Sequence, residues 1–414
     1  MKLDVRSNGA LLKLDLYCTG THLDDSLFVE DEGGRPLMRT RAGLGSGLEL
    51  VLPGNHWTNV PVTESFVKSS PYVLKKDKGH FILWRDKEPL VEVKLAPKPE
   101  WYNRRTASGK LMTRVGTLQG TYLGVYPTAV CEFWTGEEKS NCHFCSVGLN
   151  LGADDADTKS IEEVAEVART AVKESDITYV DFNAGHYEGE TYLKQLIPYV
   201  ERVKRDTNVL IGLQTPPHSD LKQYDELQAR GVNRVSFCFE IFDEARFKEV
   251  CPGKSRTYGL KRYLDAVEYT ATLARKAGLT HPWVANGEII AGLESPESSM
   301  KAIDWITSVG AIPTVCIFRP LKGTDYADVP PPRTEDMIPV FQRLYEACMA
   351  RNLPIGVAPN VKVSLVLLPE ECASLVPRRW RYYAKEMKLR AMSKAFALKF
   401  YRDRDKAMGR SAAA

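Results

Sequence analysis

The middle of the chain repeats one pattern that leaves few folds open. Between about residues 120 and 360, short apolar segments alternate six times with longer segments whose apolar residues recur every three or four positions. The short segments are predicted strands, and the longer ones are predicted amphipathic helices. Such an alternation forms a parallel sheet covered by helices. Six units favour a partial or complete TIM-type (β/α) barrel, which is an α/β fold, over a Rossmann sheet.

The expected elements have definite places in this region. The predicted strands are 121–130, 177–185, 209–217, 233–240, 283–294 and 312–321. The predicted helices are 160–172, 191–204, 220–231, 260–278, 298–310 and 334–352. Ser160 and Glu163 have the spacing of a capping box, and Gly231 is placed to end a helix.

Two flanking regions differ from this centre, so the sequence predicts three parts. Residues 1–112 are expected to be a β-rich accessory domain, with strand-like runs at 10–20, 47–54, 72–86 and 90–97. Residues 113–370 form the predicted barrel. Residues 371–414 are a predicted basic helical extension, because positions 378–410 hold 12 Lys and Arg against 3 Asp and Glu. Such a helix could contact nucleic acid or another polyanion, or pack on the barrel with a solvated face.

The bulk composition narrows the class of protein. The formal net charge of the 414 residues is +3 and 26% are charged, which argues against a chain that coats nucleic acid or membranes. No apolar run has the length of a signal peptide or a membrane span, so no membrane partner is expected. The nine cysteines are an odd number and scattered, which indicates the reducing cytoplasm rather than a disulfide framework.

Three of those cysteines stand close together, directly after the first predicted barrel strand. Cys131, Cys142 and Cys145 form a CX10CX2C pattern. Structural zinc requires four ligands, and the sequence offers no fourth beside them. Three thiolates instead suit a 4Fe-4S cluster with one iron left open. Barrel chemistry collects at the C-terminal ends of the strands, where this trio is expected to lie.

The trio resembles the signature of the radical S-adenosylmethionine (radical SAM) superfamily. That signature is CxxxCxΦC, where Φ is aromatic, and it follows the first barrel strand. Cys142, Phe144 and Cys145 match its second half, whereas ten residues replace three in the first gap. The resemblance covers about residues 120–360. Its later part is most similar to the biotin-synthase-like branch, which acts on small molecules.

The resemblance implies residues that bind S-adenosylmethionine. Gly185 aligns with the family's GGEP motif, in which His186 replaces the glutamate. Glu240 matches the glutamate that ends the fourth strand. Ile290 and Gly292 match positions that flank the adenine, and Phe144 is expected to pack beside the same base.

The resemblance also implies the chemistry. The open iron chelates S-adenosylmethionine, and one electron from an external flavodoxin-type or ferredoxin-type donor releases a 5′-deoxyadenosyl radical that abstracts hydrogen from a substrate. A long first cysteine gap also occurs in a pyridinol methylase of this branch, so we expect methyl, or another group, transfer to a small molecule. Candidate substrate residues at strand ends are Gln214, Asn286, Glu288 and Arg319. Arg319 could hold a carboxylate or phosphate, or form a structural salt bridge.

Two other functions remain open from the sequence. The N-terminal domain and the basic tail could present a macromolecule, tRNA or a protein, to a radical SAM barrel. Alternatively, the cysteines could bind zinc in a scaffold without SAM chemistry.

Overall fold

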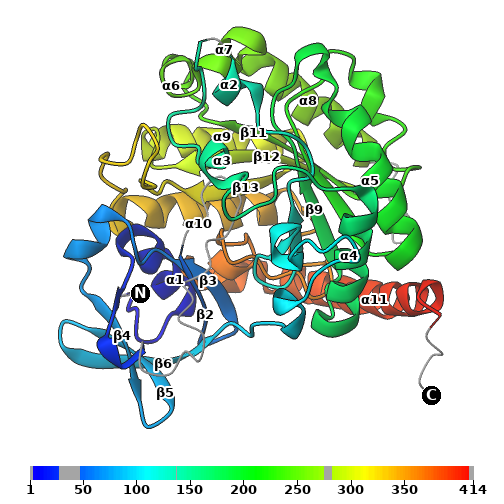
Figure 1. Ribbon diagram of the computed structural model, residues 1–414. Coiled ribbons are helices and arrows are strands. Elements are labelled where there is room, and N and C mark those ends of the chain that lie inside the picture. Colours follow the sequence, from blue (N-terminus) through cyan, green and yellow to red (C-terminus); the bar gives the residue numbers. More distant parts are fainter. Residues whose placement is uncertain (1–2, 28–46, 137, 275–281, 410–414) are drawn as a thin grey trace.

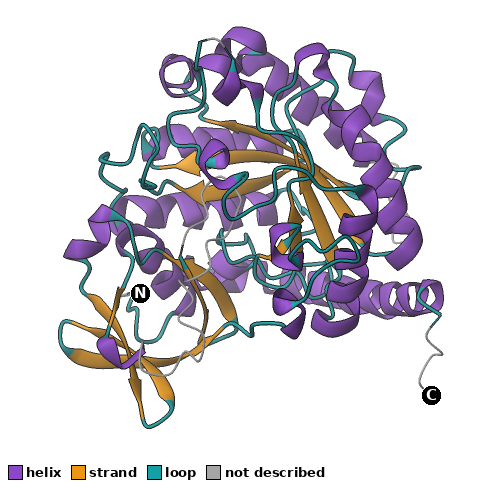
Figure 2. Cartoon of the chain, viewed as in Figure 1, coloured by secondary structure: helices purple, strands orange, loops and turns teal. Residues whose placement is uncertain are grey.

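A computed structural model describes residues 3–27, 47–136, 138–274 and 282–409. Seven strands form the central sheet, in the order β13-β12-β11-β10-β9-β8-β7. Strands β8 to β13 are parallel, and β7 pairs antiparallel with β8. The two edge strands, β7 and β13, do not pair with each other, so the curled sheet is an open barrel with its helices outside (Figures 1 and 2). This confirms the predicted fold class.

The strands and helices of the barrel follow the predicted alternation. The strands are β7 (Thr117–Leu118), β8 (Leu123–Val125), β9 (Tyr179–Asn183), β10 (Leu210–Gln214), β11 (Arg234–Glu240), β12 (Val284–Ala291) and β13 (Ile312–Ile317). The helices are α2 (Glu132–Thr135), α3 (Val147–Asn150), α4 (Ile161–Ser175), α5 (Tyr192–Thr207), α6 (Glu244–Val250), α7 (Pro252–Thr257), α8 (Gly259–Leu273), α9 (Pro296–Ser308) and α10 (Thr334–Ala350). The last residues of the predicted helix 260–278, from 275 on, lie outside the described residues.

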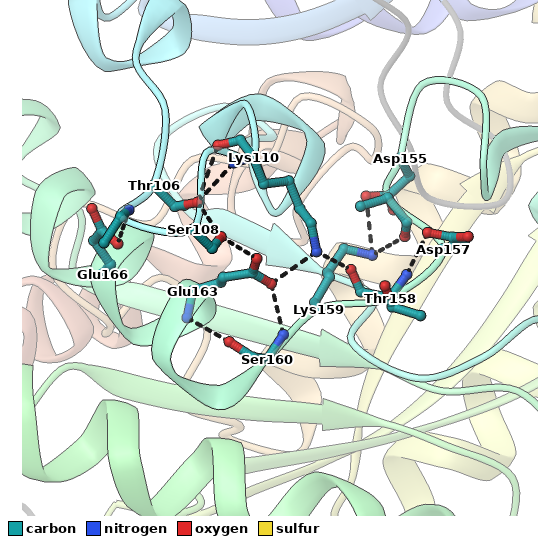
Figure 3. Close-up of polar contacts among 12 residues, drawn as sticks. Thr106, Ser108, Lys110, Asp155, Asp157, Thr158, Lys159, Ser160, Glu163 and Glu166 are labelled. Carbon is teal, nitrogen blue, oxygen red and sulfur yellow. Dashed lines mark hydrogen bonds and ion pairs between the residues drawn. The ribbon is translucent and has the colours of Figure 1, made fainter.

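The capping box at the start of α4 is confirmed, and it belongs to a larger polar network (Figure 3). Lys110 Nζ lies 2.9 Å from a carboxylate oxygen of Glu163, which ties the chain before β7 to this helix. The fully buried Lys159 donates to the carbonyl of Tyr126 at 2.6 Å and pairs with Asp155 at 3.2 Å. This network fixes the chain just before Cys131.

Two barrel predictions need correction. The strand expected at 121–130 is only β8, because Lys159 holds the Tyr126 carbonyl and the chain then leaves the sheet. The helix expected at 220–231 is a short 3-10 turn, Leu221–Tyr224. Asp220 caps the amide of Lys222, and the backbone bonds donated by residues 223, 225 and 227 join residues three apart, as in turns.

The N-terminal region has its own six-stranded sheet, in the order β1-β4-β5-β6-β2-β3. Its strands are β1 (His22–Leu23), β2 (Leu48–Leu52), β3 (His56–Val60), β4 (Tyr72–Asp77), β5 (His80–Arg85) and β6 (Glu88–Leu95). The strand expected at 10–20 is wrong, because these residues form helix α1 (Gly9–Thr19). Asn8 caps this helix and Gly20, with φ of 68°, ends it. Both the small sheet and the barrel contact α1, so the helix is buried on all sides, Lys13 and Asp15 included, and lacks the helical periodicity.

One extended segment covers the barrel where it is open. This closing segment, residues 354–370, follows α10 and lines the barrel interior. Thr121 donates its amide to the Lys362 carbonyl beside β8, and Asn59 of β3 donates to the Ser364 carbonyl at 2.7 Å. The Tyr17 hydroxyl and the Lys13 ammonium, both from α1, donate to carbonyls at 364 and 363. The N-terminal region therefore fastens the cover of the barrel.

The C-terminal extension is helical, as predicted. A 3-10 turn at Arg379–Tyr382 leads into α11 (Tyr383–Ala407), which runs beneath the barrel at the right of Figure 1. Phe396 and Phe400 pack against Tyr122, Tyr179 and Leu210 at the N-terminal ends of the strands. Arg404 is buried and bonds to Asp176 at 2.7 Å. No helix among the described residues is long and apolar enough to cross a bilayer.

Lys13 tests how strongly the N-terminal region fastens the cover. Its ammonium is fully buried and lies 2.9 Å from the Glu371 carboxylate, so Lys13→Met leaves a buried carboxylate with His56 and the Leu368 amide as partners. We expect a loss of about 3 kcal/mol in the free energy of unfolding, measured in urea. Lys261→Met breaks an exposed pair with Asp265 and is the control, expected to cost below about 0.5 kcal/mol. Equal effects of the two substitutions would contradict the fastening role.

Candidate active site

A cavity of about 790 Å³ occupies the inside of the barrel. All three clustered cysteines line it, together with Phe144, Gly185, His186, Gln214, Glu240, Glu288 and Ile290. Residues that the sequence analysis selected from five different segments therefore line one cavity. Its volume lies in the range of about 300–1,000 Å³ that is usual for small-molecule sites.

The ten-residue gap between the first two cysteines folds back so that all three cysteines line the same cavity. Cys131 precedes the short helix α2, and the Ser140 amide bonds to the Phe133 carbonyl at 2.9 Å. The loop then rests on the end of α6, where the His143 amide donates to the Val250 carbonyl at 3.0 Å. The inserted residues are thus a compact element that returns Cys142 and Cys145 to Cys131.

The chain after β9 forms the wall beside Cys131. The His186 amide donates to the Cys131 sulfur at 3.3 Å. A Cβ on Gly185 would lie 2.4 Å from the Cys131 Cβ, so only glycine allows this approach. The His186 ring stacks on Phe133 and bonds to the Tyr258 hydroxyl at 2.5 Å. His186 therefore packs against the inserted loop, which is a role that the GGEP alignment did not indicate.

The surroundings of the three thiols raise their pKa values. Burial raises the pKa of Cys131, and it raises that of Cys145 to about 12. A hydrogen bond to Cys251, with burial, raises the pKa of Cys142. Cys251 is thus a fourth thiol beside the trio, which the sequence spacing hid because about 105 residues separate it from Cys145.

The donor set fits a cluster. Cys142 lies near enough to raise the pKa values of Cys131 and Cys145, and the lining of the shared cavity is mostly apolar. Within the described ranges, no three His, Cys, Asp or Glu side chains are arranged for a single metal ion. A 4Fe-4S cluster, in contrast, takes each thiolate on its own iron. Cys131, Cys142 and Cys145 are the residues that would hold it.

Glu240 ends β11 in a strained conformation beside a buried cation. Its φ is 68°, and a bulge interrupts the strand pairing between Cys238 and Glu240. Lys254 donates to the Glu240 carboxylate at 2.7 Å and to the Cys238 carbonyl at 2.6 Å. Sequence reasoning missed Lys254, whose only signal was its place shortly after the fourth strand. A left-handed non-glycine residue at a strand end is typical of a functional site.

The strands send a second polar set into the middle of the cavity. Asn286, Glu288 and Ile290 alternate along β12, so all three face inward. Gln214 Nε2 donates to Glu288 at 2.7 Å, and Arg234 lies 3.1 Å from Asp181 and 2.9 Å from Asn286. Arg234 and Asp181 were not predicted. Their alternation in the strands was visible, but the sequence does not show which face of each strand points inward.

The lower part of the cavity is apolar. Trp283, Ile312 and Ile355 line it, and Met392 and Phe396 of α11 contribute to its floor. The closing segment adds the valines at 357, 361, 363 and 366. The end of the cavity next to α11 is therefore largely apolar.

Arg319 and Gly292 lie outside this cavity. The Arg319 side chain is 1% exposed, donates to Asn59 at 3.0 Å and lies over the Tyr17 ring. The expectation that it faces the barrel interior is wrong, because the strand has ended and the side chain turns to the N-terminal region. Gly292 has φ of 97° and a Cβ there would meet Pro332, so it serves the turn after β12.

Glu288 gives a pH-dependent signature of the site. Burial raises its pKa from 4.5 to about 7. The folded state therefore keeps a proton that the unfolded chain releases, so this residue's contribution to stability falls as pH rises from about 4.5 to 7 and is constant above. Between pH 5 and pH 8, the free energy of unfolding, measured in urea, should fall by about 3 kcal/mol more in the native chain than in Glu288→Gln. Since Glu49 and Glu370 also have pKa values raised to about 7, only the difference between the two proteins reports on Glu288. If the free energy of unfolding changes equally with pH in the two proteins, Glu288 is ionised in the folded state.

No family model matches the chain. The chain is 27% identical over 128 residues to a bacteriochlorophyllide c C-7(1)-hydroxylase of Chlorobaculum limnaeum, a match that covers 31% of each protein. Among solved structures it is similar to methylornithine synthase (PylB; 16% identity, TM-score 0.42, 55% of this chain and 62% of that one). It is also similar to the radical SAM enzyme coproporphyrinogen III oxidase (HemN) of Escherichia coli (18%, 0.32, 42% and 41%).

These matches span less than two thirds of each relative's length. Three features belong to this chain itself: the parallel open barrel, the CxΦC half-motif, and three cysteines that line one cavity beside Gly185. They are the features in which the chain resembles the radical SAM superfamily.

Proposed function

We propose that the protein cleaves S-adenosylmethionine reductively and uses the resulting radical to abstract hydrogen from a small molecule inside the barrel. One observation carries the proposal: three thiols lie at the mouth of a cavity of about 790 Å³ whose middle is polar and whose floor is apolar. The cluster and S-adenosylmethionine supply the radical chemistry when bound. An external one-electron donor of the flavodoxin or ferredoxin type supplies the electron.

The chain's own residues bind and orient S-adenosylmethionine. Glu240, held by Lys254, presents a carboxylate at the end of β11 for the polar groups of S-adenosylmethionine. Phe144 and Ile290 offer apolar surfaces for its adenine. Gly292 lies beyond the cavity, so its part is limited to shaping the turn after Ile290.

The middle of the cavity suits a substrate polar group. Glu288 has its pKa near neutrality, so it can hold or accept a proton there. Gln214 orients Glu288, while Arg234 and Asp181 lie in the layer below. The closing segment excludes water from this space, which protects a radical from quenching.

The outcome of hydrogen abstraction is a separate proposal. The sequence resemblance favours methyl transfer, whereas the curated relative is named a hydroxylase. We propose hydroxylation or a related modification of a C–H bond, because that relative shares sequence with this chain and no pattern here is specific to methyl transfer. In hydroxylation, the substrate radical left by hydrogen abstraction would lose one electron to an external acceptor and take its oxygen from water, with release of a proton. No contact among the described residues supports the alternative in which tRNA or a protein is presented to the barrel. Zinc binding by the three thiols is the second candidate function.

Anaerobic reconstitution with iron and sulfide tests the function. The native chain should bind about four irons, absorb visible light and release 5′-deoxyadenosine from S-adenosylmethionine under reduction. Cys142→Ala should do none of these. With S-adenosylmethionine labelled in its methyl group, hydroxylation leaves the label off the product and methyl transfer adds it. A colourless protein that holds one zinc and leaves S-adenosylmethionine intact would sink the proposal.

Gly185→Ala tests the geometry of the cysteine site. The new methyl group would overlap Cys131, so we expect iron content and visible absorbance to fall at least several-fold while the fold persists. Gly310→Ala is the control, because that glycine has φ of 92°, lies after α9 and has no neighbour within 4 Å of its Cβ position. It should cost about 1 kcal/mol of stability and leave the iron content unchanged. Full iron loading of Gly185→Ala would contradict the arrangement.

A further inference from the structure

The outward side of α11 gathers the exposed apolar side chains of this protein. Six large apolar side chains are exposed among the described residues, and four of them lie between positions 380 and 398. They are Trp380, Tyr383, Met387 and Leu398, with exposed fractions of 73%, 64%, 45% and 78%. Such a concentration on one element marks an interaction surface.

The three that belong to α11 share one side of the helix, and Trp380 lies in the 3-10 turn before it. Tyr383 and Met387 are one turn apart, the exposed Ala391 and Ala395 continue the row, and Leu398 follows. Phe396 and Phe400, which pack on the barrel, lie on the opposite side. Thus α11 is apolar on two opposite sides, one for the barrel and one outside it. We call the second, residues 380–402, the outer face.

Positive charge flanks the outer face. Exposed basic residues border the apolar row, namely Arg381, Lys388, Arg390, Lys394 and Arg402. The only acidic residue from 378 to 402 is Glu386, whose side chain is 12% exposed and pairs with Arg379 at 2.7 Å. Arg390 lies 3.9 Å from the same carboxylate and Arg402 lies 3.8 Å from Asp403, so the face combines exposed apolar groups with a net positive charge.

We propose that the outer face of α11 docks on the surface of an anionic membrane. An apolar row with Trp and Tyr, bordered by Lys and Arg, is the pattern of helices that lie in the interface plane of anionic bilayers. Aromatic rings suit the headgroup level, and the long basic side chains reach the lipid phosphates.

Other occupants fit less well. A second copy would bring another strongly positive helix against this one, so repulsion opposes self-association. Nucleic acid would satisfy the cations and could stack on the two rings, but Met387 and Leu398 would gain little from it. No described helix could span a bilayer, but this does not affect the proposal, because α11 would lie on the membrane surface rather than across it.

The location of α11 connects this surface with the active site. The same helix contributes Met392 and Phe396 to the apolar floor of the cavity. Docking would therefore place that floor, one helix thickness away, next to the lipid.

Vesicle sedimentation of the full-length chain tests the proposal without cluster or substrate. We expect binding to vesicles of phosphatidylcholine with phosphatidylglycerol, weakened by salt, and little binding to phosphatidylcholine alone. Removing two cations with Lys388→Gln and Lys394→Gln should weaken binding roughly 25-fold, at about five-fold per charge. Trp380→Ala with Leu398→Ala should weaken it at least about ten-fold.

The matched control is Leu95→Ala with Leu149→Ala, which removes the two exposed leucines outside the tail. It should leave binding unchanged, and all variants should melt at the native temperature because the altered side chains are exposed. Equal binding to both kinds of vesicle, or none to either, would overturn the proposal. So would preferential binding of a single-stranded RNA homopolymer that is lost in the Lys388→Gln, Lys394→Gln variant.

Discussion

An open parallel barrel must have its missing side covered, and that requirement organises this molecule. The unpaired edges, β7 and β13, leave the interior accessible, and the closing segment fills the gap. An extended chain in that place carries backbone groups that need partners. The turn before β8 and strand β3 supply them, and Tyr17 and Lys13 complete the set. The N-terminal region thus acts on the active site through the backbone of residues 362–364.

The fully buried ion pair of Lys13 and Glu371 shows the cost of this arrangement. Burial lowers the pKa of Lys13, while the charge of Lys13 opposes the burial of Glu371 and helps to bring the pKa of that carboxyl down to about 2. Each charge is tolerable only because the other is present. Arg319 belongs to the same interface, where it links the end of β13 to Asn59 rather than to a substrate.

The polarity of the cavity lining changes along the barrel, from the cysteines to helix α11. Thiols occupy the mouth, paired charges such as Lys254 with Glu240 follow, and an apolar chamber closes on α11. Reactive groups therefore lie at the C-terminal ends of the strands, as in other barrels, and the opposite end serves to enclose. Helix α11 contributes to the floor of the cavity on one side and carries the basic and apolar outer face on the other.

The sequence by itself determined the alternation of strands and helices, the capping box of α4 and the cysteines of the site. These follow from local periodicity and residue chemistry, which do not depend on distant contacts. Only the tertiary structure decided that residues 10–20 form a helix, because burial on all sides erases the pattern that identifies one. It also decided which side chains meet: Cys251 reaches Cys142, Lys254 reaches Glu240, and Arg319 turns away from the cavity. Such pairings depend on how far the sheet curls and which face of each strand points inward, and spacing along the chain does not encode either.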